Sequence, residues 1–274
     1  MGKELIEEFR RRVGNDAGMA EMTALYADLL SLQSSVEQDF IVPPLSQQDV
    51  QARISRRVPA LAPEELRAEA NAFQDIWKRV CAVTLQHRAD LQDALDEICR
   101  WAEADEGHLE QLAELYLRGE LQIISQEAGL DPALLKFLMN QTLRPFLRRY
   151  AQTVAPWIHT DHWYQPYCPV CGGEPDFAVL EKPHGTRRLL CSRCDFEWPY
   201  RRTSCPYCGC ADPEKYQYAL SEDNVYRLYL CDHCHRYLKT LDLREIFEDR
   251  LLPIERIVTL PMDIAAYQAG YCGM

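Results

Sequence analysis

The stretch CPVCGGEPDFAVLEKPHGTRRLLCSRC, at residues 168–194, decides the fold of the C-terminal part of this 274-residue chain. It begins and ends with a Cys-x-x-Cys turn, here called a knuckle, which directs two thiolates toward one point. A second stretch at residues 205–234, CPYCGCADPEKYQYALSEDNVYRLYLCDHC, has the same arrangement. Gly172 and Gly209 follow the leading knuckle of each stretch, where a positive φ lets backbone amides turn toward the sulfurs.

Two knuckles together supply the four soft ligands of a tetrahedral zinc or iron site. The gaps inside the two stretches are 19 residues (172–190) and 22 residues (209–230), at or slightly beyond the usual range of zinc ribbons. This spacing pairs the knuckles within each stretch and predicts two metal ions per chain. A crossed pairing, first knuckle with third and second with fourth, stays open. The predicted ligands are Cys168, Cys171, Cys191, Cys194, Cys205, Cys208, Cys231 and Cys234.

The two stretches read as an internal repeat. Arg188-Leu-Leu-Cys191 is echoed by Arg227-Leu-Tyr-Leu-Cys231, and Trp198 and Leu238 each follow a closing cysteine by four positions. Little apolar sequence lies between the knuckles, so we expect metal binding to supply much of the folding free energy of each copy. With four thiolates per metal, neither site has an open coordination position for water, and we expect no metal-based catalysis.

The composition is that of a folded acidic protein. Hydrophobic residues make up 47% of the chain and charged residues 26%, as in a globular protein. The formal net charge is −12, of which about −9 falls on residues 1–163. Nucleic-acid binding depends on Lys and Arg that neutralise phosphates, so we expect no nucleic-acid partner. The sequence contains no Gly-rich phosphate loop, nucleophile elbow or His-Glu-x-x-His motif. We therefore expect that the chain is not an enzyme and has no small-molecule substrate.

The N-terminal sequence predicts a cytoplasmic protein. Residues 1–14, MGKELIEEFRRRVG, carry acidic side chains and lack the apolar segment of a signal peptide. No run of 18 apolar residues occurs, so we expect no membrane insertion. Thiols stay reduced in the cytoplasm, where paired cysteines indicate metal sites rather than disulfides.

The pattern along the chain predicts an α+β protein of several domains. These are an all-α domain at 1–160, two tandem rubredoxin-like or zinc-ribbon modules at 164–204 and 205–248, and a short C-terminal helical segment at 249–274. Asp131-Pro132 is a strong helix start, and Pro145 is expected to kink or split the helix behind it. Predicted strands are 177–180, 187–190 and 226–230; residues 243–252 and 262–270 are expected as helices and 257–260 as extended chain.

Two further groups of side chains stand out in the modules. Five arginines, Arg187, Arg188, Arg193, Arg201 and Arg202, gather in the first module, where they either bind an acidic partner or form a solvated face. Cys210 adjoins a knuckle and is a reactive thiol, a spare ligand or, as we favour, a bystander.

These motifs resemble the FdhE family of formate dehydrogenase accessory proteins. The resemblance runs from Cys168-Pro-Val-Cys171-Gly through Glu197-Trp198 and Arg202, and then through Tyr237-Leu-Lys-Thr240 to Gly270-Tyr271. It implies a helical domain followed by two rubredoxin-like modules with iron, and a cytoplasmic, non-catalytic role in maturing formate dehydrogenase by contact with its catalytic subunit. Asp195 and His235 stand where a rubredoxin has glycine, which counts against iron and against electron transfer.

Three functions compete on this basis. The favoured one is an accessory, chaperone-like protein that binds a metalloenzyme precursor. The second is an iron-containing electron-transfer protein, and the third is a zinc-ribbon nucleic-acid-binding factor, which the acidic charge disfavours.

Overall fold

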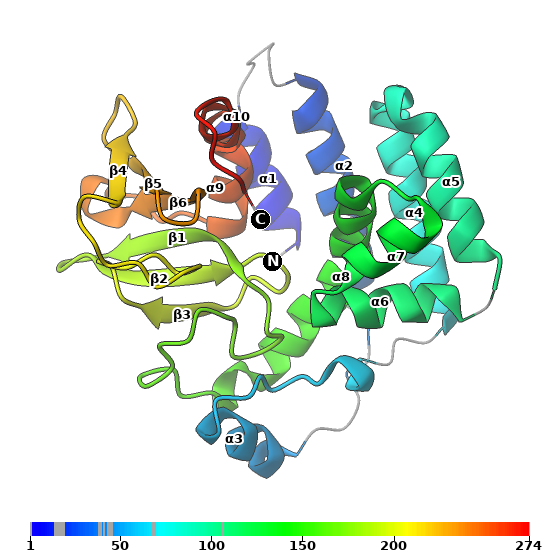
Figure 1. Ribbon diagram of the computed structural model, residues 1–274, viewed down its shortest axis with the longest axis horizontal. Helices are drawn as coiled ribbons and strands as arrows, with labels where there is room; N and C mark the ends of the chain where they lie inside the picture. The colour runs from blue at the N-terminus through cyan, green and yellow to red at the C-terminus, as the bar shows by residue number, and fades with distance from the viewer. Residues whose placement is uncertain are drawn as a thin grey trace. The chain divides into compact units, whose positions relative to one another are not determined.

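The computed structural model describes residues 2–13, 20–37, 40, 42, 46–66, 70–105 and 107–273, which form two compact units (Figure 1). The first unit is Met1–Leu45 with Leu61–Thr153, and the second is Ser46–Ala60 with Val154–Met274. These units divide the chain elsewhere than the predicted domain boundaries. The two modules share one unit, and residues 46–60 join them rather than the helical domain. Backbone contacts explain this, because the Ala60 amide donates to the Pro169 carbonyl at 2.8 Å.

The first unit is helical, as predicted. Its elements are α1 (Gly2–Val13), α2 (Ala20–Glu37), η2 (Pro63–Glu65), α4 (Ala70–His87), η3 (Ala89–Leu91), α5 (Gln92–Glu103), α6 (His108–Arg118), α7 (Leu121–Ala128) and α8 (Pro132–Val154). The Asp131 carboxylate accepts a 2.7 Å bond from the Leu134 amide, which confirms the predicted start of α8. Pro145 lies inside α8 without splitting it. Gly119 and Gly129 end α6 and α7 in the left-handed conformation.

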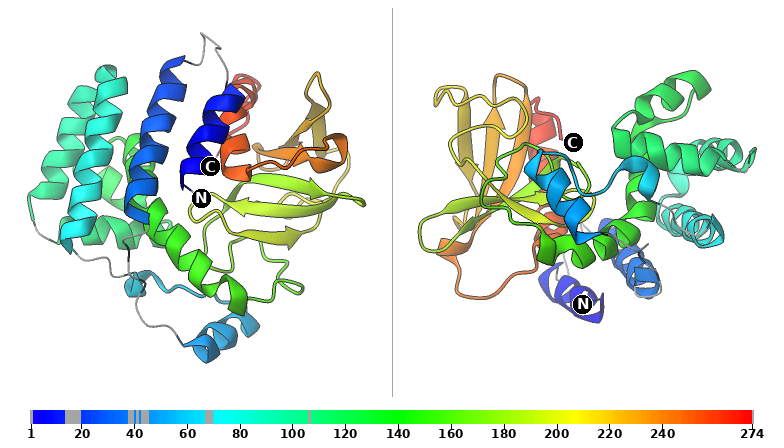
Figure 2. Two further views of the ribbon diagram at one scale, coloured as in Figure 1. Left: turned by 180° about the vertical axis from the view of Figure 1, so that it is seen from behind. Right: turned by 90° about the horizontal axis from the view of Figure 1, so that it is seen from below.

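The second unit contains a six-stranded sheet, which Figure 2 shows from behind and from below. Its strands are β1 (Pro175–Glu181), β2 (Thr186–Cys191), β3 (Glu197–Tyr200), β4 (Tyr216–Leu220), β5 (Tyr226–Cys231) and β6 (Arg236–Asp242). Each module is a three-stranded antiparallel meander, β1-β2-β3 and β4-β5-β6. A parallel pair between β1 and β6 joins them, so the strand order is β3-β2-β1-β6-β5-β4. The predicted strands lie within β1, β2 and β5.

The remaining elements of this unit are α3 (Gln47–Ser55), η4 (Ala155–Trp157), η5 (Leu243–Glu245), α9 (Leu252–Val258) and α10 (Leu260–Gln268). One face of the sheet packs against the C-terminal segment in a core that includes Phe177, Val179, Leu190, Leu241 and Leu252. The predicted helix near 262–270 is present as α10. The extended chain predicted at 257–260 is wrong, because these residues lie in the helices α9 and α10. The helix predicted at 243–252 is limited to η5 and the first residue of α9.

No helix among the described residues is long and apolar enough to cross a membrane.

Candidate metal centres

The first cysteine cluster is buried. Cys168 and Cys171 come from the turn before β1, Cys191 is the last residue of β2, and Cys194 lies in the turn after it. The sulfur of Cys171 lies 3.4 Å from that of Cys191 and 3.5 Å from that of Cys194, and the Cys168 and Cys194 sulfurs are 3.5 Å apart. All four side chains are shielded from solvent.

The second cluster has the same construction but reaches the surface. Cys205 and Cys208 precede β4, Cys231 is the last residue of β5, and Cys234 follows it. The Cys205 and Cys234 sulfurs are 3.8 Å apart, and those of Cys208 and Cys231 are 3.6 Å apart. Cys208 is exposed and Cys234 half-buried. The structure thus groups the knuckles within each repeat, and the crossed pairing does not occur.

Both clusters fit a tetrahedral metal ion. At a metal–sulfur distance of about 2.3 Å, tetrahedral geometry places the sulfurs about 3.8 Å apart, close to the separations found here. Amide groups also point at the sulfurs, from Val170 to Cys168 at 3.3 Å and from Tyr207 to Cys205 at 3.4 Å. Each cluster can therefore hold one metal ion, and the donor set suits zinc and iron equally.

Thiol acidity supports the same conclusion. Burial raises the pKa of Cys168 and of Cys194 well above that of a free thiol. Burial also raises the pKa of Cys234, to about 11. Four thiolates at this spacing repel one another strongly, and a cation at the centre is what allows them to ionise together.

Asp195 and His235 adopt the backbone conformation of the glycines they replace. Their φ angles are 58° and 54°, in the left-handed region that glycine occupies most easily. The knuckle turn therefore forms without glycine at these positions, at a cost in backbone strain.

Comparison with known proteins finds relatives of one kind. The profile described as "FdhE, central domain" matches residues 167–202, which include the first cysteine cluster. The chain is 31% identical over 170 residues to the protein FdhE homolog of Aquifex aeolicus, covering 60% of this chain and 59% of that protein. It is 26% identical over 240 residues to the FdhE homolog of Shewanella oneidensis, covering 72% of this chain and 78% of that protein. The chain is therefore similar in sequence to FdhE proteins.

A solved structure shows the same fold. The crystal structure of the FdhE protein from Pseudomonas aeruginosa superposes with a TM-score of 0.65 at 22% sequence identity. The match covers 98% of this chain and 91% of that one. The alignment with the Aquifex relative, by contrast, spans less than two thirds of that relative's length.

In the folded structure, the five arginines of the first module differ in burial and in contacts. Arg187 is completely buried, so it is no part of a docking surface. Arg188 lies 3.7 Å from Glu181 and 3.6 Å from Glu197 in two ion pairs. Arg193 is half-buried and its amide donates to the Cys191 sulfur at 3.4 Å. Arg201 is exposed and Arg202 half-buried, and partner binding by these two stays a prediction.

Cys210 has a backbone role. Its carbonyl accepts a 2.9 Å bond from the Cys205 amide, as the Gly173 carbonyl does from Cys168 at 2.8 Å in the first cluster. Its sulfur is not among the four that form the second cluster, so it is no ligand there.

Sequence reasoning missed the residues that tie the C-terminal helices to the first cluster. Arg256 on α9 donates to the Cys191 carbonyl at 2.8 Å and to Asp195 at 2.7 Å, and it lies 2.9 Å from Asp176. Lys239 on β6 donates to the Arg256 carbonyl at 2.8 Å.

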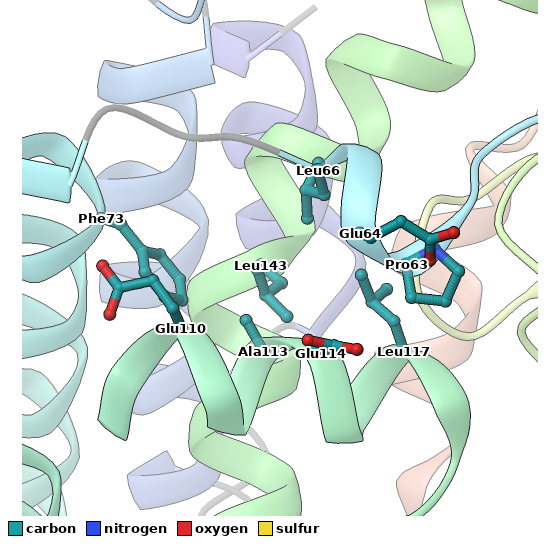
Figure 3. Close-up of a pocket in the computed structure, with 9 residues that line it drawn as sticks. All are labelled: Pro63, Glu64, Leu66, Phe73, Glu110, Ala113, Glu114, Leu117 and Leu143. Atoms are coloured by element: carbon teal, nitrogen blue, oxygen red, sulfur yellow. The ribbon is translucent and has the colours of Figure 1, made fainter. Parts of the chain in front are cut away.

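A pocket of about 310 Å³ lies in the helical unit, between η2, α4, α6 and α8 (Figure 3). Phe73, Leu117 and Leu143 form part of its apolar floor, and Glu64, Glu110 and Glu114 stand at its rim. Within the part of the chain that the structure describes, the only groups of side chains able to hold a metal ion are the two cysteine clusters. These rim carboxylates therefore form no further metal site.

Proposed function

We propose that the chain is a non-catalytic accessory protein that binds the catalytic subunit of formate dehydrogenase in the cytoplasm during its maturation. The observation that carries this proposal is the pair of closed four-cysteine clusters in an FdhE fold. Each cluster uses all four tetrahedral positions for thiolates, so a bound metal keeps no position for substrate or water. In this proposal the metal ions, ligated by the eight cysteines, hold a docking surface rigid.

The proposed docking surface lies beside the turn between β1 and β2. Arg201 is exposed, and Arg202 reaches that turn, since a methyl group added at Gly185 would meet its Nη1 atom at 2.9 Å. On the same turn the Lys182 ammonium lies 5.7 Å from the ring of Phe247, which is fully exposed to solvent. Exposed cations beside an aromatic side chain are typical of protein interfaces.

Affinity purification tests the proposal. A tagged chain isolated without oxygen from a cell that makes formate dehydrogenase should retain the catalytic subunit. Replacing Cys168 and Cys171 with Ala should unfold the first module, remove its metal and abolish this binding. A wild-type chain that elutes alone at low salt would contradict the accessory role, and normal metal content in the variant would contradict the ligand assignment.

Electron transfer through iron is the second candidate, and the exposure of Cys208 favours it. An exposed ligand offers a short path for electrons to the second cluster, whereas the first cluster is enclosed. This candidate requires iron in the purified protein, a visible absorption band and reversible one-electron reduction. Colourless protein with two zinc ions per chain would exclude it.

A further inference from the structure

Arg187 is a buried cation without a carboxylate partner. Its side chain has no solvent exposure, and its guanidinium lies 4.3 Å from the ring centre of Tyr229. Nη1 donates to the Tyr216 hydroxyl at 2.9 Å, to the Ser204 carbonyl at 3.2 Å and to the Arg201 carbonyl at 3.4 Å, while Nε and Nη2 have no hydrogen-bond partner. No carboxylate of the described residues pairs with it. A buried charge without compensation is costly, by several kcal/mol.

Comparison of the two repeats shows which carboxylate partner Arg187 lacks. Arg187 stands four residues before Cys191, and Arg227 stands four residues before Cys231. Because β2 ends at Cys191 and β5 at Cys231, the position of Arg227 in its strand corresponds to Arg187 and not, as the sequence had suggested, to Arg188. Arg227 binds the Asp242 carboxylate at 2.7 Å. The position equivalent to Asp242 in the first module is occupied by Arg202. The first module thus keeps the arginine and has replaced its acidic partner with a second cation.

The contacts of Arg187 lead to the second cysteine cluster. Ser204, whose carbonyl accepts from Nη1, is bonded directly to the ligand Cys205. Tyr216, whose hydroxyl accepts from the same nitrogen, lies opposite the ligand Cys231 in the β4–β5 pair. Arg187 belongs to the first module, yet the two shorter of its three hydrogen bonds go to residues next to ligands of the second cluster.

A loaded second cluster would supply the missing negative charge. Four thiolates around one divalent cation leave a net charge of about −2. Arg236 is near this cluster as well, but two bonds to Glu174, at 3.2 and 2.8 Å, already compensate its charge. The first cluster differs, because its nearby guanidinium, that of Arg256, is paired with both Asp176 and Asp195.

We propose that Arg187 is the counter-cation of the second metal centre, so that this centre keeps its metal with the help of a residue from the other module. Arg187 is thereby a positioning residue, which acts on the thiolates through the field of its charge and through Ser204 and Tyr216. The second metal centre therefore depends on a residue of the first module. The proposal rests on metal binding at the second cluster and is independent of any partner protein.

Two substitutions of similar length separate charge from packing. Arg187→Lys keeps the positive charge, and Arg187→Met removes it while filling much of the same space. The probe is Zn²⁺, loaded at two ions per chain and then challenged with a chelator. Alkylation of each cysteine, followed by mass spectrometry, reports which cluster loses its metal.

In Arg187→Met we expect the second-cluster cysteines to become reactive about 10-fold to 100-fold faster than in the wild type, with the first cluster unchanged. Arg187→Lys should fall between the two. Arg227→Met is the matched control, because its loss leaves Asp242 paired with Arg244 and should not change zinc release selectively.

Equal zinc retention in the Lys and Met variants would overturn the proposal, as would equal loss from both clusters in folded Arg187→Met protein. If the Met variant does not fold, Arg187→Lys decides alone. Zinc release from its second cluster that is no faster than in the wild type would then overturn the proposal. The proposal would also be overturned if the wild-type chain bound no zinc at the second cluster. None of these outcomes depends on formate dehydrogenase binding.

Discussion

Arg227 on β5 donates two hydrogen bonds to one oxygen of Asp242 on β6, from Nε at 3.0 Å and from Nη2 at 2.7 Å. Arg244 holds the same carboxylate through Nε at 2.8 Å and Nη2 at 2.7 Å. Burial opposes ionisation of this side chain, but the bonds from Arg244 and Arg227 outweigh it and lower the pKa of Asp242 to about 2. Asp242 is therefore ionised in the folded protein and neutralised by two arginines.

Replacing Asp242 with Asn should lower the free energy of unfolding by about 2 kcal/mol at pH 7, which corresponds to the change in pKa from 3.8 to about 2. Because the folded state has the lower pKa, this stabilisation is complete above about pH 5 and is lost as the pH falls through about 2. Chemical denaturation of both proteins across this range measures the difference. A difference that stays constant with pH would contradict the assignment.

The two cysteine clusters should release metal in a fixed order. Cys208 is exposed and Cys234 half-buried, whereas every cysteine of the first cluster is buried. We expect a chelator to remove zinc from the second cluster first, because attack on a ligand requires access to it. Time-resolved native mass spectrometry combined with cysteine alkylation would follow both clusters in one sample. Loss from the first cluster before the second would contradict this order.

Removal of Asp263 should leave a buried ammonium group without its partner. Lys239 is buried, and its Nζ lies 2.7 Å from the Asp263 carboxylate. We expect Asp263→Ala to lower the free energy of unfolding by about 3 kcal/mol at pH 7. The double variant Lys239→Met/Asp263→Leu, which removes both charges, should restore most of this loss, and denaturant titration of the three proteins checks both expectations.

The pH dependence of Asp263→Ala has a definite sign. Burial lowers the pKa of Lys239 in the folded protein below its ordinary value of 10.5. The unfolded chain therefore binds the proton more tightly, and the variant should regain stability as the pH rises toward 10.5. A stability that falls over this range would contradict the burial of a charged Lys239.

Charge reversal should weaken docking to the proposed partner. In Arg201→Glu/Arg202→Glu, affinity for the formate dehydrogenase catalytic subunit should fall about tenfold at low salt, with a smaller effect at high salt. Arg79→Glu/Arg88→Glu changes the net charge equally on the helical unit and serves as the control. Surface plasmon resonance at two salt concentrations gives both affinities. Equal losses in the two variants would indicate a general effect of charge.

The sequence predicted the cysteine clusters because their chemistry is local. A Cys-x-x-Cys turn places two sulfurs together whatever surrounds it, and two such turns at ribbon spacing leave few ways to combine. The start of α8 was predictable for the same reason, since Asp131 and Pro132 act within one turn of helix.

The parts that were missed depend on contacts between distant segments. The β-branched residues Ile257, Val258 and Thr259 favour extended chain, but Pro253 at the start of α9 and the bonds of Arg256 to the first module select a helix. The burial of Arg187 follows from tyrosines of β4 and β5, about 30 to 40 residues away in the sequence. The parallel pairing of β1 with β6 has no local signal at all.

The ribosome makes β1 well before its parallel partner β6. β1 ends at Glu181 and β6 begins at Arg236, so 54 residues separate the two strands. At a ribosomal rate of about 5–20 residues per second, the outer edge of β1 waits about 3–11 s for its partner. During that interval its backbone amides and carbonyls are a template for pairing with other chains. A ribosome that pauses between the modules would thus hold a nascent chain prone to aggregate.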